Sequence, residues 1–287
     1  MDKASVSITE LLGDARPTIS FEFFPPKDAA GFDTLRTTFS TLQKFNPDFI
    51  SVTYGAMGSN QESSLAVVQE FANQIPTIAH LTCIGATRAT ISSLLDSYKS
   101  FGVAGILALR GDIPKGYEGN PLGDFASAND LITHIDGSNF EIGVSAFPEK
   151  HPESPSLAHD IEVLKLKQES GANFAMTQLF FEIDAYFELV SSARDAGISI
   201  PIVPGVMPIA NAKQVLRMAE MSGAQIPEKL LNELNSATDE EAARSVGMAF
   251  SAELAKSLIA GGAPGLHIFT LNHHKATTEL LEAAGLA

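Results

Sequence analysis

Short apolar runs alternate with amphipathic stretches along most of the chain. Runs rich in Ile, Val, Leu and Phe predict eight strands, at 18–24, 48–54, 77–83, 104–110, 140–147, 173–181, 198–205 and 265–272. Stretches with helical spacing follow them, at 32–45, 61–74, 89–101, 126–135, 157–170, 184–196, 210–222 and 275–284, and further helical pattern fills 227–260. The strand and helix units repeat roughly every 30 residues.

This alternation of strand and helix predicts a parallel sheet covered by helices. Continuous apolar strands suit a sheet that is buried on both faces. Eight units predict an α/β protein with a (β/α)₈ TIM barrel, whereas a doubly wound open sheet usually carries a Gly-rich first turn, and no G-x-G-x-x-G follows the first strand. No linker-like stretch interrupts the pattern, so we expect a single domain over 1–287 with extra helices near its C-terminus.

Composition narrows the range of partners. The chain has 287 residues, and its net charge of −15 argues against a nucleic-acid or anionic-membrane partner, because such binding depends on a basic surface. No apolar run reaches the roughly 20 residues of a membrane span, and the N-terminal residues lack the apolar core of a signal peptide. A single cysteine, Cys83, excludes an internal disulfide. We therefore expect a cytoplasmic protein.

Polar residues recur where the predicted strands end. Barrel enzymes place their active sites at the carboxyl-terminal ends of the strands, so these residues are candidates for a site. They are Glu22, Thr53, Tyr54, His80, Thr82, Arg110 to Asp112, Phe147 to His151, Thr177, Gln178 and Asn272 to His274. Recurrence at most of the predicted strands favours a functional site over isolated structural roles.

Glu22 stands out in the stretch SFEFFPP, residues 20–26. A carboxylate among phenylalanines is costly to bury unless it has a partner. It either pairs with an Arg or Lys of a neighbouring strand, or burial keeps it protonated and ready to act as a general acid. For the second role we expect the adjacent phenylalanines to form an apolar wall around it, with Pro25 and Pro26 ending the strand. His80 has a similar alternative as a buried structural histidine.

Other chemistries have less support. A metal-dependent hydrolase would need clustered ligands, whereas the histidines are scattered and the first strand has no His-x-His, so we predict no metal site. No G-x-S-x-G motif indicates a nucleophilic serine. The tripeptide at 110–112 is RGD, but cell adhesion would require an exposed loop of an extracellular protein.

Several motifs, in matching order, resemble the flavin-dependent methylenetetrahydrofolate reductase family. They are SFEFFPPK (20–27), ISVTYGA (50–56), IAHLTCIGAT (78–87), ILALRGDIP (106–114), AFPEKHPES (146–154), GANFAMTQLFFE (171–182), IVPGVMPI (202–209) and PGLHIFTLN (264–272). The resemblance implies a (β/α)₈ barrel that binds FAD at its carboxyl-terminal rim. It implies ping-pong hydride transfer from NAD(P)H through FAD to 5,10-methylenetetrahydrofolate, giving 5-methyltetrahydrofolate for methionine biosynthesis and one-carbon metabolism. It also implies a homo-oligomer.

The resemblance assigns roles residue by residue. Glu22 matches the acid that protonates a folate nitrogen, so that the five-membered ring opens to an iminium. Asp112 matches a carboxylate near the flavin and the pterin, and Gln178 and Gln214 match substrate contacts. The positions matching FAD contacts are Thr53, Tyr54, Ala56, His80, Leu109, Arg110, Gly111, Asp112, Ala126, Phe147, His151, Asp160 and Lys167. Arg110 and Lys167 would supply positive charge for the diphosphate or the ribityl chain.

The chain departs from the family pattern at a few positions. Val163 and Leu166 stand where enteric bacterial members carry Asn and Arg, which leaves Lys165 as a replacement for part of the phosphate contact. His273 stands at an Arg position that touches folate, and Phe269 replaces a Tyr. Val163 and Leu166 leave a second hypothesis open, namely a folate-binding barrel of another class, such as a pterin methyltransferase or a flavin-free reductase. No motif in the sequence decides between NADH and NADPH.

Overall fold

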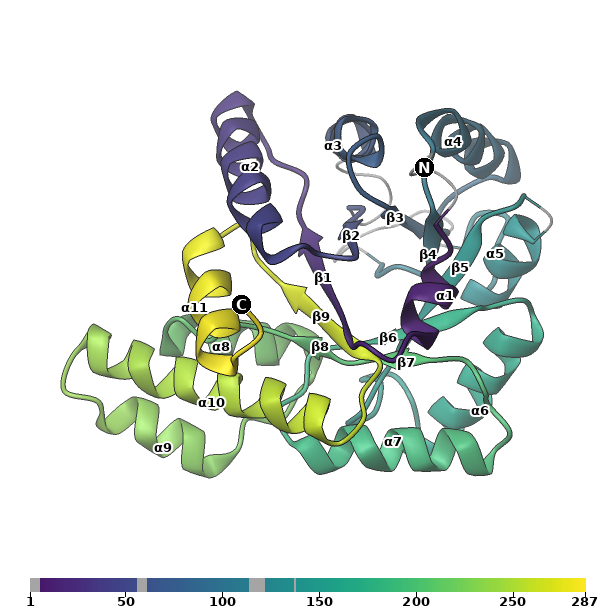
Figure 1. Ribbon diagram of the computed structural model, residues 1–287. Helices are drawn as coiled ribbons and strands as arrows, with labels where there is room; N and C mark the ends of the chain where they lie inside the picture. The colour runs from purple at the N-terminus through teal and green to yellow at the C-terminus, as the bar shows by residue number, and fades with distance from the viewer. Residues whose placement is uncertain (1–5, 56–60, 114–121, 137) are drawn as a thin grey trace.

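The computed structural model describes residues 6–55, 61–113, 122–136 and 138–287 (Figure 1). The strands are β1 Thr18–Phe23, β2 Phe49–Val52, β3 Thr77–Thr82, β4 Gly105–Leu109, β5 Glu141–Ala146, β6 Phe174–Thr177, β7 Ile202–Val203, β8 Gly205–Val206 and β9 Gly265–Phe269. The helices are α1 Ile8–Gly13, α2 Ala29–Leu42, α3 Gln61–Ala72, α4 Arg88–Phe101, α5 Ala128–Ile135, α6 Leu157–Glu169, α7 Ile183–Asp195, α8 Ala212–Ser222, α9 Glu228–Ser236, α10 Glu240–Ala260 and α11 His274–Ala284, with a 3-10 turn η2 at Gln43–Phe45.

The strands form one parallel sheet in the order β7-β6-β5-β4-β3-β2-β1-β9-β8. Its two outer strands, β7 and β8, are consecutive in the chain and separated only by Pro204, so the sheet closes into a barrel. Proline has no amide hydrogen to give to a ladder, which explains why the seventh predicted strand is split in two. In Figure 1 the last unit, β9 and α11, lies beside the first, β1 and α2. The predicted (β/α)₈ barrel is confirmed.

Local signals in the sequence explain where many helices begin. Ser, Thr, Asp or Asn precedes the first helical residue, and its side chain accepts a backbone N–H of the first turn that would otherwise lack a partner. These capping residues are Ser7, Asp28, Thr87, Ser127, Ser156, Asn211 and Asp239. The stretch predicted as helical over 227–260 is two helices, α9 and α10, with Asp239 capping the second.

Strand alternation divides the apolar residues between two cores. Side chains facing outward from the strands pack beneath the helices in the main core. Side chains facing inward fill the amino-terminal half of the barrel, where Phe49, Leu107 and Phe174 pack with Ile8 and Leu12 of α1. The sequence analysis did not predict α1. This short helix covers the amino-terminal end of the barrel, and the buried polar residues Glu22 and His80 lie toward the opposite end.

The expected phenylalanine wall around Glu22 is wrong for Phe21 and Phe23. Phe21 and Phe23 are buried in the outer core, and the Phe23 ring lies 6.1 Å from Phe39 and 6.2 Å from Phe71, measured between ring centroids. Successive side chains of a strand point to opposite faces, so direct sequence neighbours of Glu22 cannot share its environment. The two prolines do follow the end of β1 as predicted.

No helix in the described part of the chain is both long and apolar enough to cross a membrane. Within the same residues, no group of three or more His, Cys, Asp or Glu side chains is arranged to hold a metal ion.

Candidate active site

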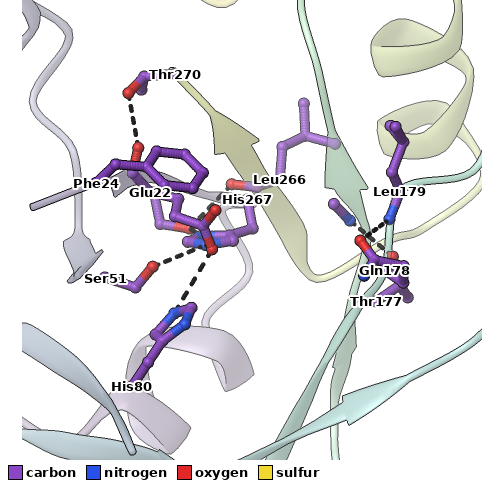
Figure 2. A network of polar contacts seen from close by, with 12 residues as sticks. Glu22, Phe24, Ser51, His80, Thr177, Gln178, Leu179, Leu266, His267 and Thr270 are labelled. Atoms are coloured by element: carbon purple, nitrogen blue, oxygen red, sulfur yellow. Dashed lines mark hydrogen bonds and ion pairs between the residues drawn. The ribbon is translucent and has the colours of Figure 1, made fainter. Parts of the chain in front are cut away.

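Glu22 lies near the carboxyl-terminal end of β1 and is only 8% exposed. Its Oε2 atom is 3.5 Å from Nε2 of His80 on β3 and 3.8 Å from Nε2 of His267 on β9 (Figure 2). No Lys or Arg of the described residues forms an ion pair with it. The predicted alternative, an ion pair between Glu22 and an Arg or Lys of a neighbouring strand, is therefore absent from the described residues. The side chains next to the Glu22 carboxyl group are two histidines.

His80 is a neutral partner for Glu22. Burial lowers the pKa of His80 to about 4, against the opposing effect of Glu22. Its Nε2 atom makes no hydrogen bond, because 3.5 Å to Glu22 is too long for a well-formed one, and the buried hydroxyl of Thr82 on the same strand has none either. Buried polar groups normally have partners, so two unpartnered atoms on one face of β3 indicate a place for a ligand.

His267 holds a defined orientation beneath Glu22. Nδ1 lies 2.8 Å from the Ser20 hydroxyl and Nε2 lies 3.1 Å from the Ser51 hydroxyl. Ser20 donates its hydrogen to the Leu266 carbonyl at 3.1 Å, so we assign the histidine hydrogen to Nδ1, with Nε2 accepting from Ser51. The two serines therefore hold the His267 ring in place below Glu22.

The sequence analysis missed His267, although the signal was present. His267 is a polar residue inside the apolar strand GLHIFTLN, which is the pattern that drew attention to Glu22 and His80. The register of β1 on β9 pairs Ser20 with His267 and so brings it to the same inner face as Glu22. Its position in the middle of β9 separates it from the candidates that follow the strand ends.

The backbone around Glu22 is tied to the end of β9. Thr270 donates its hydroxyl hydrogen to the Glu22 carbonyl at 2.6 Å (Figure 2). The Asn272 side chain accepts from the Phe24 amide at 3.0 Å and donates to the Phe24 carbonyl at 2.8 Å. Asn272 has a φ of 58°, a left-handed conformation that Asn tolerates better than most residues. These bonds fix the position of Glu22 along the barrel axis.

A cavity of about 420 Å³ opens at the same end of the barrel, over β4 to β6 and beside α5 and α6. Its volume is in the range of small-molecule sites. The predicted cofactor and substrate residues that line it are Leu109, Arg110, Gly111, Asp112, Phe147, His151, Asp160, Lys167 and Gln178. The lining also includes Ser127, Asn129, Glu153, Ser154 and His159, which the sequence analysis did not assign.

Two residues supply fixed positive charge to this cavity, and they differ in how deeply they are buried. Lys167 is buried, and its ammonium group donates to the Ser145 carbonyl at 3.0 Å. Burial lowers the pKa of Lys167 to about 8, against the opposing effect of Asp160. Arg110 is half-buried, and its Nη1 atom lies 2.7 Å from a carboxylate oxygen of Glu153.

The backbone at Gly111 passes very close to the neighbouring strand. Gly111 has a φ of 86°, and a Cβ there would lie 2.8 Å from a methyl group of Ile84 and 2.9 Å from Cβ of Thr82. Only glycine allows this conformation and this approach without strain. The loop after β4 can therefore bring Arg110 and Asp112 to the rim.

Other predicted site residues do not line the cavity. The Tyr54 hydroxyl donates to Gln61 at 3.3 Å, and the Thr53 carbonyl accepts from Ser64 at 3.0 Å. The amide of Ala126, an exposed residue, donates to Asp130 at 2.8 Å. Thr53 and Tyr54 follow β2 at the carboxyl-terminal rim, whereas Ala126 precedes α5. Ala56 lies outside the described residues.

Three predicted substrate residues, Glu22, Gln214 and His273, are absent from the cavity lining. Gln214, in the first turn of α8, accepts from the Ala210 amide at 3.4 Å. His273 is exposed and precedes α11. Among the described residues, no hydrogen bond or ion pair joins Gln214 or His273 to Glu22 or Gln178.

The residues of α6 that depart from the family pattern differ in whether they line the cavity. Val163 lines the cavity, and Leu166 is exposed on α6. Lys165 is exposed and absent from the lining, so it does not supply the replacement charge that the sequence analysis expected; Lys167 is the lysine in the cavity. The difference follows from helical spacing, because residues two apart on α6 face different directions.

The fold and the site together define a (β/α)₈ barrel protein with a buried carboxyl group and a small-molecule cavity at the carboxyl-terminal rim. The family model for methylenetetrahydrofolate reductase matches residues 7–285. The chain therefore belongs to the methylenetetrahydrofolate reductase family.

Individual relatives agree with this assignment. Methylenetetrahydrofolate reductase (NADH) 1 of Zea mays is 36% identical over 301 residues, which covers 99% of this chain and 51% of that protein. The 5,10-methylenetetrahydrofolate reductase of Escherichia coli (strain K12) is 32% identical over 289 residues, covering 99% and 96%. The chain thus spans about half the length of the plant relatives and nearly the full length of the bacterial one.

A solved structure supports the fold. It is described as an uncharacterized protein from Clostridium thermocellum that binds two copies of 5-methyl-5,6,7,8-tetrahydrofolic acid. The TM-score is 0.66 at 16% identity, over 98% of this chain and 97% of that one. At this identity the likeness concerns the barrel.

Proposed function

We propose that this protein reduces 5,10-methylenetetrahydrofolate to 5-methyltetrahydrofolate, with NAD(P)H as the hydride source, FAD as a bound cofactor and Glu22 as the general acid. The observation that carries the proposal is the setting of Glu22, a buried carboxyl group between two histidines at the rim of a barrel of this family. The names of the maize and Escherichia coli relatives, and the folate bound to the clostridial barrel, support the substrate class.

The described residues fit FAD. Arg110 and Lys167 are the fixed cations of the cavity lining and would face its diphosphate, and the tight turn at Gly111 brings Arg110 to the rim. The unpartnered hydroxyl of Thr82 is free to bond a planar heterocycle at the rim. When bound, FAD would accept hydride from NAD(P)H and return it to the folate.

Glu22 would supply the proton that the folate needs. A hydrogen on Oε2 would lie between the Nε2 atoms of His80 and His267, 3.5 and 3.8 Å away, until substrate arrives. Transfer of that hydrogen to a folate nitrogen opens the five-membered ring and leaves an iminium as hydride acceptor. The new carboxylate would lie 3.5 Å from Nε2 of neutral His80, and a small approach of the two groups would let this N–H donate a hydrogen bond to it.

Gln178 and Asp112 would orient the substrate. Both line the cavity from opposite sides, Gln178 after β6 and Asp112 after β4. In the present structure the Gln178 side-chain oxygen accepts from the Leu179 amide at 2.8 Å, which leaves its NH₂ group to donate to a ligand (Figure 2). The exposed carboxylate of Asp112 would favour a folate cation.

A spectroscopic experiment tests the proposal. The purified protein, supplied with FAD, should be yellow; NAD(P)H should bleach it under anaerobic conditions, and 5,10-methylenetetrahydrofolate should restore the colour. Protein that binds no FAD but still reduces the folate would favour a flavin-free reductase, the alternative that apolar Val163 in the cavity keeps open. Comparing NADH with NADPH in the bleaching step would identify the coenzyme, since relatives named for each exist.

FAD binding should depend on pH through Lys167. Its folded-state pKa of about 8 lies below the ordinary value of 10.5, so the apoprotein loses this charge as pH rises through 8. A diphosphate favours the charged form, so the FAD dissociation constant should stay level below pH 8 and rise by up to about tenfold per pH unit above it. Titrations of the apoprotein at successive pH values measure this.

A matched variant isolates the contribution of the lysine. Lys167→Met should bind FAD more weakly at pH 7 and show no rise between pH 8 and 10. A wild-type dissociation constant that is level over this window would contradict the role given to Lys167.

The same pKa shift has the opposite effect on the stability of the apoprotein. Between pH 8 and 10.5 the unfolded chain binds more protons at this group than the folded chain, so the free energy of unfolding should rise with pH there. Denaturant unfolding of the apoprotein at pH 7.5 and 9.5 therefore separates a loss of affinity from a loss of folded protein.

A further inference from the structure

The guanidinium group of Arg110 is already engaged by a carboxylate of the protein itself. Its Nη1 atom lies 2.7 Å from Oε2 of Glu153, and both residues line the cavity. Its Nε atom donates to the Gly111 carbonyl at 3.2 Å. An anionic ligand that uses the outer edge of this guanidinium must therefore replace Glu153.

The ion pair between Arg110 and Glu153 affects the balance of charge in the cavity lining. Within the described lining, Asp112, Glu153 and Asp160 face two fixed cations, Arg110 and Lys167. Asp160 has a structural use, because its carboxylate accepts the backbone N–H of His151 at 2.9 Å. With Glu153 in place the lining carries an excess of negative charge, which disfavours a diphosphate.

The Glu153 side chain is placed to move, while its backbone is held. The side chain is 64% exposed, so rotation about its own bonds takes the carboxylate into solvent. The backbone amide of Glu153 donates to Nδ1 of His151 at 3.0 Å. The Lys150 ammonium donates to the carbonyls of His151 and Ser154, at 3.1 and 2.7 Å. This fixed turn returns the carboxylate to Arg110 whenever the site is empty.

We propose that Glu153 is a built-in competitor for the phosphate groups of the flavin cofactor, holding Arg110 in the empty site and releasing it when the phosphates bind. The inference rests on the proposed function, because it takes FAD as the ligand of this cavity. It makes Glu153 a residue that sets cofactor affinity. It predicts that the competition acts on flavins that carry phosphate and not on riboflavin.

The test compares Glu153→Gln with Glu162→Gln in the apoprotein. Glu162 is exposed on α6, lies 3.5 Å from His159 and is not part of the cavity lining, so its substitution removes the same charge without freeing Arg110. FAD and riboflavin are titrated by flavin fluorescence at low and high salt. Glu153→Gln should bind FAD about fivefold more tightly at low salt, as expected for release of an exposed ion pair. The gain should shrink at high salt, where such charges are screened.

Riboflavin affinity should be the same in wild type, Glu153→Gln and Glu162→Gln. In an Arg110→Gln background, Glu153→Gln should give no gain in FAD affinity, because the competitor acts through the guanidinium. Equal tightening of riboflavin, equal tightening by Glu162→Gln, or no tightening of FAD by Glu153→Gln would each overturn the proposal. Wild-type protein that binds no FAD would overturn the proposed cofactor and this inference together, whereas wild type that binds FAD with no gain in the variant overturns the inference alone.

Discussion

Replacing Glu22 with Gln is expected to lower the rate of methylenetetrahydrofolate reduction by about 10²- to 10⁴-fold, the usual contribution of a general acid. Reduction of the flavin by NAD(P)H should continue at the wild-type rate, because that step needs no proton from this residue. Gln has the shape of Glu and can keep the polar contacts with His80 and His267. It lacks the acidic hydrogen that would open the folate ring. Stopped-flow absorbance of the flavin measures the two steps separately.

Glu141→Gln is the matched control. Glu141 begins β5 at the opposite end of the barrel, where its carboxylate accepts the Thr9 amide at 3.0 Å and the Ser7 hydroxyl, and so holds α1 in place. The same substitution there should lower the thermal stability and leave both half-reactions unchanged. A Glu22→Gln protein that reduces the folate at the wild-type rate would show that the acid lies elsewhere.

Replacing His267 with Leu is expected to lower the folate half-reaction by about 100-fold, the effect of a small displacement of a reacting group. His267 is 1% exposed and does not line the cavity over β4 to β6, so it would act through Glu22 as a positioning residue. Leu would remove both ring nitrogens, leaving the hydroxyls of Ser20 and Ser51 without these partners and the Glu22 carboxyl without one of its two neighbours. Each lost buried partner costs roughly 1–3 kcal/mol of stability.

Two further variants separate positioning from loss of structure. His267→Gln keeps a donor and an acceptor for the two serines, and it should recover most of the stability and part of the rate. In a Glu22→Gln background, His267→Leu should cost little additional activity, because the two residues act as a unit. An additive loss in the double variant, or an equal loss of FAD affinity, would contradict the positioning role.

Local patterns in the sequence predicted most of the fold. Apolar strands separated by amphipathic helices lead to a (β/α)₈ barrel because each strand must be covered on both faces. The prediction missed α1, since a six-residue helix has too few turns for a periodic signal. It also missed the division of the seventh strand at Pro204, although proline is the residue that interrupts a ladder.

The cavity was predictable to the extent that its residues follow strand ends directly. Arg110, Gly111 and Phe147 come immediately after β4 and β5, and the chain alone places them at the rim. Glu153 was not predictable, because a turn folded back by Lys150 brings its carboxylate to Arg110. The family resemblance assigned Lys167 to FAD, and the orientation of α6 against the barrel places Lys167, and not Lys165, in the cavity lining.

The sequence by itself determined the barrel, the family motifs and the candidacy of Glu22, because these depend on period, order and residue type along the chain. The tertiary structure decided what surrounds Glu22. Strand alternation turns Phe21 and Phe23 to the outer face, and the register of β1 on β9 brings His267 to the inner one. Neighbours in a parallel barrel come from strands far apart in sequence, so the partners of a buried acid are fixed by closure of the sheet.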